Sequence, residues 1–292
     1  MRIWQLIGFL WLLTTQIMAF QGYRNVVFVS IDGLSRETFY ALLQKNKLPH
    51  IQDVIASGNY LNMTEAAPDR LESYFQLFSG HSIDEFRDVM GSQQLKKAKT
   101  VVLPNKMSFF EHLKLKRPEV SIGLCLSQFK GSEGPLTSIL GSSRGAIDVM
   151  CEDKVRSSRE IGQQVASDIR RLWPPFLMVF NFPNVDYVGS RYREGAQLYS
   201  RAAQNCDYSF GQVLRALKEK GVLEQTVFVL TTNYGYVRRL PRKSSNVWVA
   251  SSQKMARKGT QTDLVKGLHE LFGLELPFHL AMYGQSSPFF TR

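Results

Sequence analysis

Val26-Val27-Phe28-Val29-Ser30-Ile31 is a nearly continuous apolar run near the amino terminus of the chain. Two further runs of the same kind lie at residues 176–180 and 226–230. The polar residues that follow the three runs are Asp32, Asp186 and Asn233. Short apolar runs separated by helical stretches are typical of parallel strands buried on both faces of a sheet. Functional groups in such sheets collect beyond the carboxyl ends of the strands, so we expect a site there.

The rest of the chain alternates between predicted helices and strands. Helical patterning covers residues 36–44, 71–78, 106–115, 155–172, 194–220 and 262–272. Apolar runs at 120–126 and 246–250 predict two more strands, and the Gly- and Ser-rich segment 128–145 predicts a loop. No internal repeat or polar linker divides residues 20–292. We therefore expect a single domain with a three-layer α/β/α sandwich and a mostly parallel central sheet.

Residues 1–19 have the pattern of a signal peptide. Met1-Arg2 gives a positive start, residues 3–13 are mostly apolar, and Ala19 is a small residue at the expected cleavage point. The apolar stretch is short for a membrane span, although an uncleaved N-terminal anchor is the alternative. We expect a secreted, periplasmic or secretory-pathway protein, with an N-terminal membrane tether if the segment is retained.

The chain carries a formal net charge of +11 at pH 7. Such an excess favours acidic partners, for example an anionic ligand, a glycan or a membrane surface, and a protein partner is also open. A plain cationic surface with no partner is the alternative. No basic motif interleaved with aromatic residues is present, so we expect no nucleic-acid partner.

Three cysteines, Cys125, Cys151 and Cys206, are an odd number for an exported chain. A disulfide between Cys125 and Cys151, which lie near one another in the sequence, would leave one free thiol. Three buried free cysteines are the alternative. Asn62-Met63-Thr64 fits a glycosylation acceptor, which matters only if the source is eukaryotic.

Six stretches of the chain, taken in order, carry a family resemblance. They are residues 27–33, 48–58, 77–80, 183–190, 226–235 and 262–277. Together they resemble the alkaline phosphatase superfamily, specifically its type I phosphodiesterase/nucleotide pyrophosphatase and sulfatase branches. The resemblance spans nearly the whole chain after residue 19, and it implies the same three-layer α/β/α fold. It also implies a metal site built from aspartates and histidines, with a threonine, serine or modified cysteine as nucleophile.

Several of the implied site residues are replaced in this sequence. Asp32 matches the first metal aspartate, and Asp186 matches the aspartate of the D-x-x-G-H motif, but Ser190 stands at the histidine of that motif. The S-D-H-G motif of the family is Thr232-Asn233-Tyr234-Gly235 in this chain, so a carboxamide and a phenol, Asn233 and Tyr234, replace an aspartate and a histidine.

The implied nucleophile position, ten residues before Gly80, is occupied by Arg70. Arginine stays protonated at ordinary pH and cannot attack a phosphorus or sulfur centre. Ser73 lies three residues further on and is the fallback nucleophile. The five histidines of the chain are His50, His81, His112, His269 and His279, and none occupies a family ligand position. His81 follows Gly80, and we expect it at the surface or in a loop.

The sequence therefore predicts an exported, catalytically inactive member of the superfamily, a pseudoenzyme with a binding or scaffold role and no cofactor. Fixed cations would take the place of the metals and could bind an anion. These cations are Arg70, Arg242 and Lys243.

The alternative is a divergent metal-dependent phosphodiesterase, sulfatase or phosphotransferase. Its metal would be a single Mg²⁺ or Ca²⁺ held by the oxygen ligands of Asp32, Asp186 and Asn233, or two Zn²⁺ ions.

Overall fold

The computed structural model describes residues 25–64, 70–82, 84–86, 102–128, 136–151, 154–234, 247–282 and 287–291. The expected signal peptide at residues 1–19 lies outside these ranges, and so do Arg242 and Lys243. Among the described residues, no helix combines the length and apolar character needed to cross a membrane.

Seven strands within the described ranges form one sheet in the order β2-β7-β6-β1-β5-β3-β4. Their bounds are β1 (Asn25–Ile31), β2 (Asn59–Met63), β3 (Ser121–Cys125), β4 (Val149–Met150), β5 (Phe176–Phe182), β6 (Thr226–Thr231) and β7 (Val247–Ser251). Strands β6, β1, β5, β3 and β4 pair in parallel, whereas β7 is antiparallel to both β6 and β2. The expectation of a mostly parallel sheet is confirmed.

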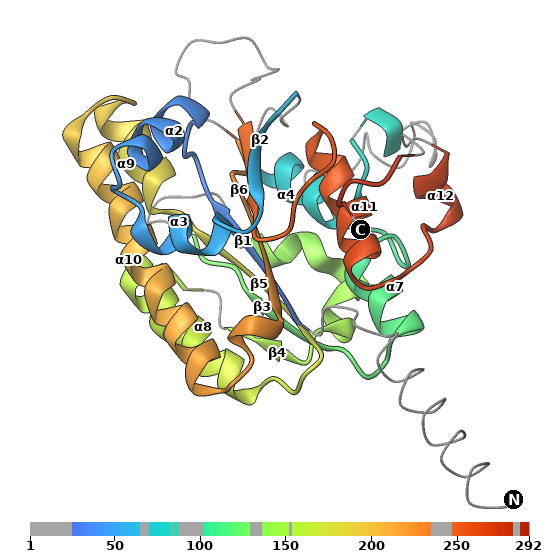
Figure 1. Ribbon diagram of the computed structural model, residues 1–292. Coiled ribbons are helices and arrows are strands. Elements are labelled where there is room, and N and C mark those ends of the chain that lie inside the picture. Colours follow the sequence, from blue (N-terminus) through green and yellow to red (C-terminus); the bar gives the residue numbers. More distant parts are fainter. Residues whose placement is uncertain are drawn as a thin grey trace, which may run out of the picture.

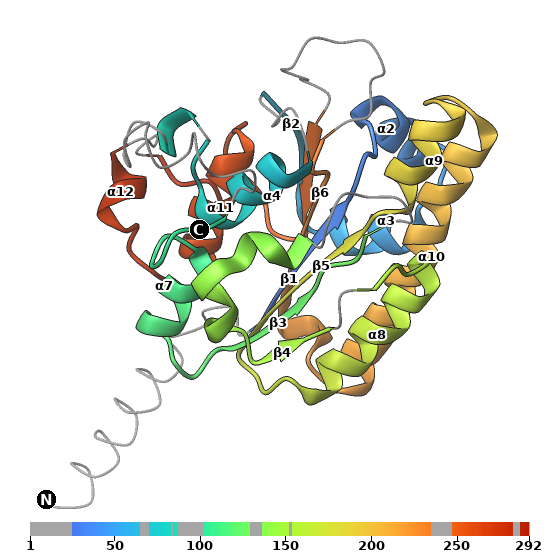
Figure 2. The ribbon, with the colours of Figure 1, turned by 180° about the vertical axis from the view of Figure 1, so that it is seen from behind.

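Helices cover both faces of the sheet. Their bounds are α2 (Arg36–Gln44), α3 (Pro49–Ile55), α4 (Arg70–Ser79), α7 (Phe109–Lys116), α8 (Ser158–Arg171), α9 (Asn184–Tyr192), α10 (Gln197–Glu219), α11 (Gln261–Leu271) and α12 (Phe278–Ala281), with 3₁₀ segments η1 (Leu136–Ala146) and η2 (Leu223–Gln225). Helices α2, α3, α8, α9 and α10 lie on one face, and α4, α7, α11 and α12 lie on the other (Figure 1 and Figure 2). The three-layer arrangement predicted from the sequence is confirmed.

The central strands are buried along their whole length, which explains their nearly continuous apolar sequences. In β1, Val26 and Phe28 belong to the core cluster that also contains residues of α4 and α11, whereas Val27 and Val29 belong to the cluster that contains residues of α8 and α10. Alternate side chains of one strand point to opposite faces of a sheet. Each strand therefore contributes to two separate hydrophobic cores.

Several features differ from the predicted elements, and β2, β4, α9 and α12 were not predicted at all. The helix expected at 194–220 begins later, because Arg193 and Gly195 adopt positive φ angles of 72° and 87° and separate α9 from α10. The segment expected to be a loop at 128–145 contains η1, whose Leu136 and Ile139 are buried in a core. The burial of its apolar residues stabilises this segment despite its Gly- and Ser-rich composition.

Cys125 at the end of β3 and Cys151 just after β4 form a disulfide, with their Cα atoms 4.9 Å apart. Cys206 is a buried free thiol in α10. Of the two cysteine arrangements open from the sequence, the structure has the one with a single bridge.

Candidate functional site

Asp32 lies at the carboxyl end of β1 and is completely buried. Its Oδ1 accepts hydrogen bonds from the Ser30 hydroxyl at 2.7 Å and the Tyr74 hydroxyl at 2.6 Å. Its Oδ2 accepts a hydrogen bond from the Asn181 amide at 2.6 Å. Burial raises the pKa of Asp32 to about 6, although Arg70 and these three donors act in the opposite direction. The carboxylate is thus surrounded by donors from the chain itself.

Asp186, in the first turn of α9, is the second retained carboxylate and is also buried. The Tyr234 hydroxyl forms a hydrogen bond with it. Burial raises the pKa of Asp186, while Tyr234 and Arg70 lower it. Burial also raises the pKa of the Tyr234 and Tyr74 phenols, and a neighbouring carboxylate adds to this effect. Both phenols therefore stay protonated and remain hydrogen-bond donors.

Arg70 is the first residue of α4, and its positive charge acts on both aspartates. Two carboxylates in a buried site are costly unless cationic groups or hydrogen-bond donors compensate them. Arg70 supplies the charge, and the phenols of Tyr74 and Tyr234 supply donors. This arrangement brings together Asp32, Asp186 and Arg70, three of the residues singled out in the sequence.

Asn233 follows β6 and is buried, and its carboxamide is held by backbone groups. Its Oδ1 accepts hydrogen bonds from the Gly33 amide at 3.0 Å and the Tyr234 amide at 2.8 Å. Its Nδ2 is buried and has no hydrogen-bond partner among the described residues. Gly33 has a φ of +73°, and a Cβ there would lie only 2.6 Å from the Asp186 Cα. Gly33 therefore permits the close contact between the segment that follows β1 and the segment that follows β5.

Ser73, the fallback nucleophile, is fully buried in α4. Its hydroxyl donates to the carbonyl oxygen of Asn233 at 2.6 Å. The Gln261 side chain donates to the same carbonyl and to that of Thr232 at 3.0 Å. Both side chains fix the backbone after β6, so the Ser73 hydroxyl is engaged in a structural contact.

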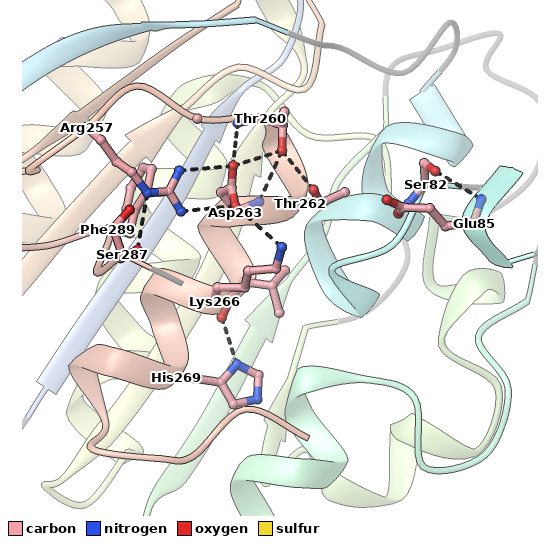
Figure 3. A network of polar contacts seen from close by, with 12 residues as sticks. Ser82, Glu85, Arg257, Thr260, Thr262, Asp263, Lys266, His269, Ser287 and Phe289 are labelled. Atoms are coloured by element: carbon pink, nitrogen blue, oxygen red, sulfur yellow. Dashed lines mark hydrogen bonds and ion pairs between the residues drawn. The ribbon is translucent and has the colours of Figure 1, made fainter. Parts of the chain in front are cut away.

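A charged network on α11 positions Gln261. Asp263 accepts from the backbone and hydroxyl of Thr260 in a capping box and forms ion pairs with Arg257 at 3.3 Å and Lys266 at 3.5 Å (Figure 3). Lys266 is almost completely buried, and the Arg257 guanidinium lies 5.6 Å from the centre of the Phe289 ring. The network anchors the helix whose first residue is Gln261.

The other residues singled out in the sequence lie away from this cluster or outside the described ranges. Ser190 is exposed on α9, and its hydroxyl donates to the carbonyl oxygen of Tyr187 at 2.8 Å. Asn62 lies in β2, where its Oδ1 accepts from the Tyr40 hydroxyl at 2.6 Å. His81 lies in a loop after α4, which agrees with one of the two expected positions, but it is completely buried and therefore not at the surface.

The described residues do not fit a divalent metal. The oxygens of Asp32 already accept three hydrogen bonds, and Asp186 accepts one from a phenol. The Asn233 oxygen is taken by two backbone amides, and its nitrogen has no lone pair to offer. No group of three or more His, Cys, Asp or Glu residues in the described part of the chain could hold a metal ion.

Sequence reasoning missed three of the donors that surround Asp32. Ser30 and Asn181 occupy strand positions whose neighbours are apolar, and a buried polar residue in such a run is a usable signal. Tyr74 gave no such signal, because an aromatic residue on a helix is compatible with ordinary core packing. Only the folded chain shows that its hydroxyl meets a carboxylate 42 residues away in the sequence.

Comparisons with known proteins agree with the fold. Residues 126–259 match the family described as type I phosphodiesterase / nucleotide pyrophosphatase. No curated protein sequence gives a significant match.

Solved structures with similar folds include Ps i-CgsB, which has a TM-score of 0.64 and 12% identity over 90% of this chain and 74% of that chain. An alkaline phosphatase superfamily protein from Vibrio parahaemolyticus has a TM-score of 0.63 and 13% identity over 88% of this chain and 68% of that chain. BT1596, a 2-O GAG sulfatase, has a TM-score of 0.59 and 12% identity over 89% of this chain and 72% of that chain.

The parallel sheet with polar residues at its carboxyl edge defines an α/β protein with an alkaline phosphatase-like fold. The family match over residues 126–259 and this fold together support the assignment of the chain to the alkaline phosphatase superfamily.

Proposed function

We propose that this protein is an exported, non-catalytic member of the alkaline phosphatase superfamily that acts through binding. One observation carries the proposal: the hydroxyls of Tyr74 and Tyr234 bind the two carboxylates that the superfamily would use for metal. Catalysis in this superfamily depends on ions that polarise the ester and lower the pKa of the nucleophile. Without ligands for such ions, the buried carboxylates would remain balanced in charge, but the site could not catalyse the hydrolysis of an ester.

The nucleophile position supports the same conclusion. Arg70 interacts electrostatically with Asp32 and Asp186, and its guanidinium cannot act as a nucleophile. The Ser73 hydroxyl is buried against the Asn233 carbonyl. A phosphate or sulfate group could bind at Arg70 only in competition with two internal carboxylates. We therefore place the recognition of acidic partners on the cationic surface, which the net charge of +11 favours.

Metal analysis and a substrate panel test this proposal. Protein purified without chelators and equilibrated with Zn²⁺, Mg²⁺ or Ca²⁺ should retain only substoichiometric metal. It should hydrolyse no phosphodiester, phosphomonoester or sulfate ester above the level of a matched blank. Stoichiometric zinc, or turnover that vanishes in an Asp32→Ala variant, would instead establish the divergent hydrolase.

A restoration variant makes the test sharper. Ser190→His, Asn233→Asp and Tyr234→His together return the implied ligand types to their family positions, and we expect this variant to gain zinc affinity. It should remain inactive because Arg70 still occupies the nucleophile position. A control with Ser190→His alone should bind no more zinc than the unmodified protein.

A further inference from the structure

One edge of the sheet lies opposite the candidate site. Strands β1, β5, β6 and β3 all begin at this edge, because Asn25 is in register with Phe176 and Thr226, and Phe176 with Ser121. The segments that lead into these strands are residues 115–119, 170–175 and 218–225, and we call them the amino edge. Asp32 and Asn233 follow the other ends of β1 and β6.

The amino edge exposes two large apolar side chains. Trp173 is 79% exposed and lies between α8 and β5, and Leu115 near the end of α7 is 74% exposed. Trp248, by contrast, is fully buried and stacks on Phe39 with ring centres 3.6 Å apart. Tryptophan is enriched where one side of a surface is apolar and the other is wet, notably at membrane interfaces.

The same edge is cationic. Its exposed and half-buried basic residues are Lys116, Arg117, Arg170, Arg171, Lys218 and Lys220. Its exposed acidic residues are Glu119, Glu219 and Glu224. Arg170 pairs with Glu219 at 2.9 Å, and Lys220 donates to the Arg170 carbonyl oxygen at 3.2 Å, which holds the ends of α8 and α10 together. Arg117 also pairs with Glu119 and Arg171 with Asp168, so the charges at this edge are held in fixed positions at the ends of α7, α8 and α10.

The amino-terminal sequence joins the fold at this edge. Asn25 is the first residue of β1, and its side chain contacts Gln225 and the Phe176 backbone. The residues before it in the sequence include the apolar stretch 3–13. Because Asn25 lies at this edge, an N-terminal membrane tether of the kind that the sequence leaves open would join the fold on this side of the sheet.

We propose that the amino edge is a docking surface for an anionic lipid bilayer, with Trp173 at the level of the headgroups and the surrounding cations facing the lipid charges. The opposite, carboxyl edge of the sheet then points away from the membrane. This inference goes beyond the proposed function and does not depend on whether the pocket is catalytic.

Vesicle flotation measures the docking directly. The protein as recovered from an exporting host is mixed with vesicles of phosphatidylcholine alone or with added phosphatidylglycerol. We expect binding to the anionic vesicles that weakens with salt. Trp173→Ala should reduce the partition constant about tenfold, because an interfacial tryptophan contributes most of the apolar contact. Lys116→Gln with Lys218→Gln should reduce it by about fivefold per charge removed.

Matched variants on other surfaces serve as controls. Phe278→Ala removes an aromatic side chain that is 80% exposed on α12. Arg36→Gln with Arg201→Gln removes two charges near the carboxyl edge, at the starts of α2 and α10. All variants carry the same amino terminus as the parent, so any contribution of that segment cancels. Both controls should bind vesicles as the unmodified protein does.

Tryptophan fluorescence gives a second readout. Subtraction of the emission spectrum of Trp173→Phe from that of the unmodified protein gives the emission of Trp173 alone. This emission should shift to shorter wavelength when anionic vesicles are added. Three results would each overturn the proposal. These are no vesicle binding, an equal loss of binding in the control variants, or binding to heparin without vesicle binding, which would point to a polysaccharide partner. The metal analysis described above is unaffected by any of these outcomes.

Discussion

Tyr74 and Tyr234 each direct a hydroxyl group at a carboxylate that the superfamily would use to hold metal. A hydrogen bond from a phenol to a charged group stabilises a folded protein more than one between neutral groups. Asp32 depends on such bonds, since burial alone would disfavour its charged form. Single side chains thus supply the buried carboxylates with donors from the chain itself.

Tyr74→Phe tests this dependence. The variant removes one donor to Asp32 and changes almost nothing in volume, so we expect the free energy of unfolding to fall by about 2 kcal/mol. Urea unfolding followed by circular dichroism measures the loss. Tyr208→Phe, at a position that is 67% exposed, is the control and should change stability little. Equal effects of the two substitutions would show that the bond to Asp32 contributes nothing.

At the scale of elements, four histidines gather in the layer formed by α4, α7, α11 and α12. His112 Nδ1 lies 3.0 Å from His269 Nε2, and the rings of His81 and His279 are 5.1 Å apart. Burial lowers the pKa of His81 and of His269 to about 4, with neighbouring histidines adding to the effect and Lys266 adding to it at His81. Burial also lowers the pKa of His112 and His279. Protonation of these histidines at acid pH should therefore destabilise the packing of this layer.

The sign of the pH effect follows from these shifts. The unfolded chain binds protons on its histidines below about pH 6.5, whereas the folded protein resists protonation of His81 and His269 down to about pH 4. Stability should therefore be fully present above pH 6.5 and fall between pH 6.5 and 4. Asp32, whose pKa is raised to about 6, acts in the opposite sense within this window.

His81→Leu separates the two contributions. The variant keeps Asp32 and removes one titrating histidine, so its free energy of unfolding should depend less steeply on pH between 6.5 and 4. Urea unfolding at several pH values measures the slope. The slope should flatten by up to about 1.4 kcal/mol per pH unit, the value for one proton. An unchanged slope would rule out His81 as a source of the acid sensitivity.

At the scale of the whole molecule, the disulfide between Cys125 and Cys151 secures one end of the sheet. It links the end of β3 to the residue after β4, the last strand of the sheet order, which is only two residues long. The bridge closes a segment with a sequence separation of 26 residues. A short edge strand has few backbone hydrogen bonds, so the cross-link contributes much of its attachment.

Removal of this cross-link should lower the free energy of unfolding by about 3 kcal/mol, the value for a closed segment of this length. Cys125→Ala with Cys151→Ala tests this by urea unfolding, and reduction of the unmodified protein should produce a similar loss. Reducing agent should have no effect on the double variant, whose remaining Cys206 is buried and unpaired. An unchanged free energy of unfolding in the double variant would contradict the stabilising role assigned to this disulfide.

The sequence by itself determined the central strands of the sheet and the place of the candidate site. The apolar runs at β1, β5 and β6 predicted strands buried on both faces, and parallel strands bring Asp32, Asp186 and Asn233 to one edge. The sequence also showed which ligand types are absent from the family positions. These conclusions rest on local pattern and on motif order.

Only the tertiary structure decided which groups surround the buried carboxylates. The contacts of Asp32 with Tyr74 and Asn181, and of Gly33 with Asn233, join residues 42, 149 and 200 positions apart. No local periodicity specifies such pairs, because they depend on how α4 packs on the sheet and how the strand ends meet. The same reason applies to the amino edge, where the segments that follow α7, α8 and α10 reach one side of the sheet only after the chain has folded.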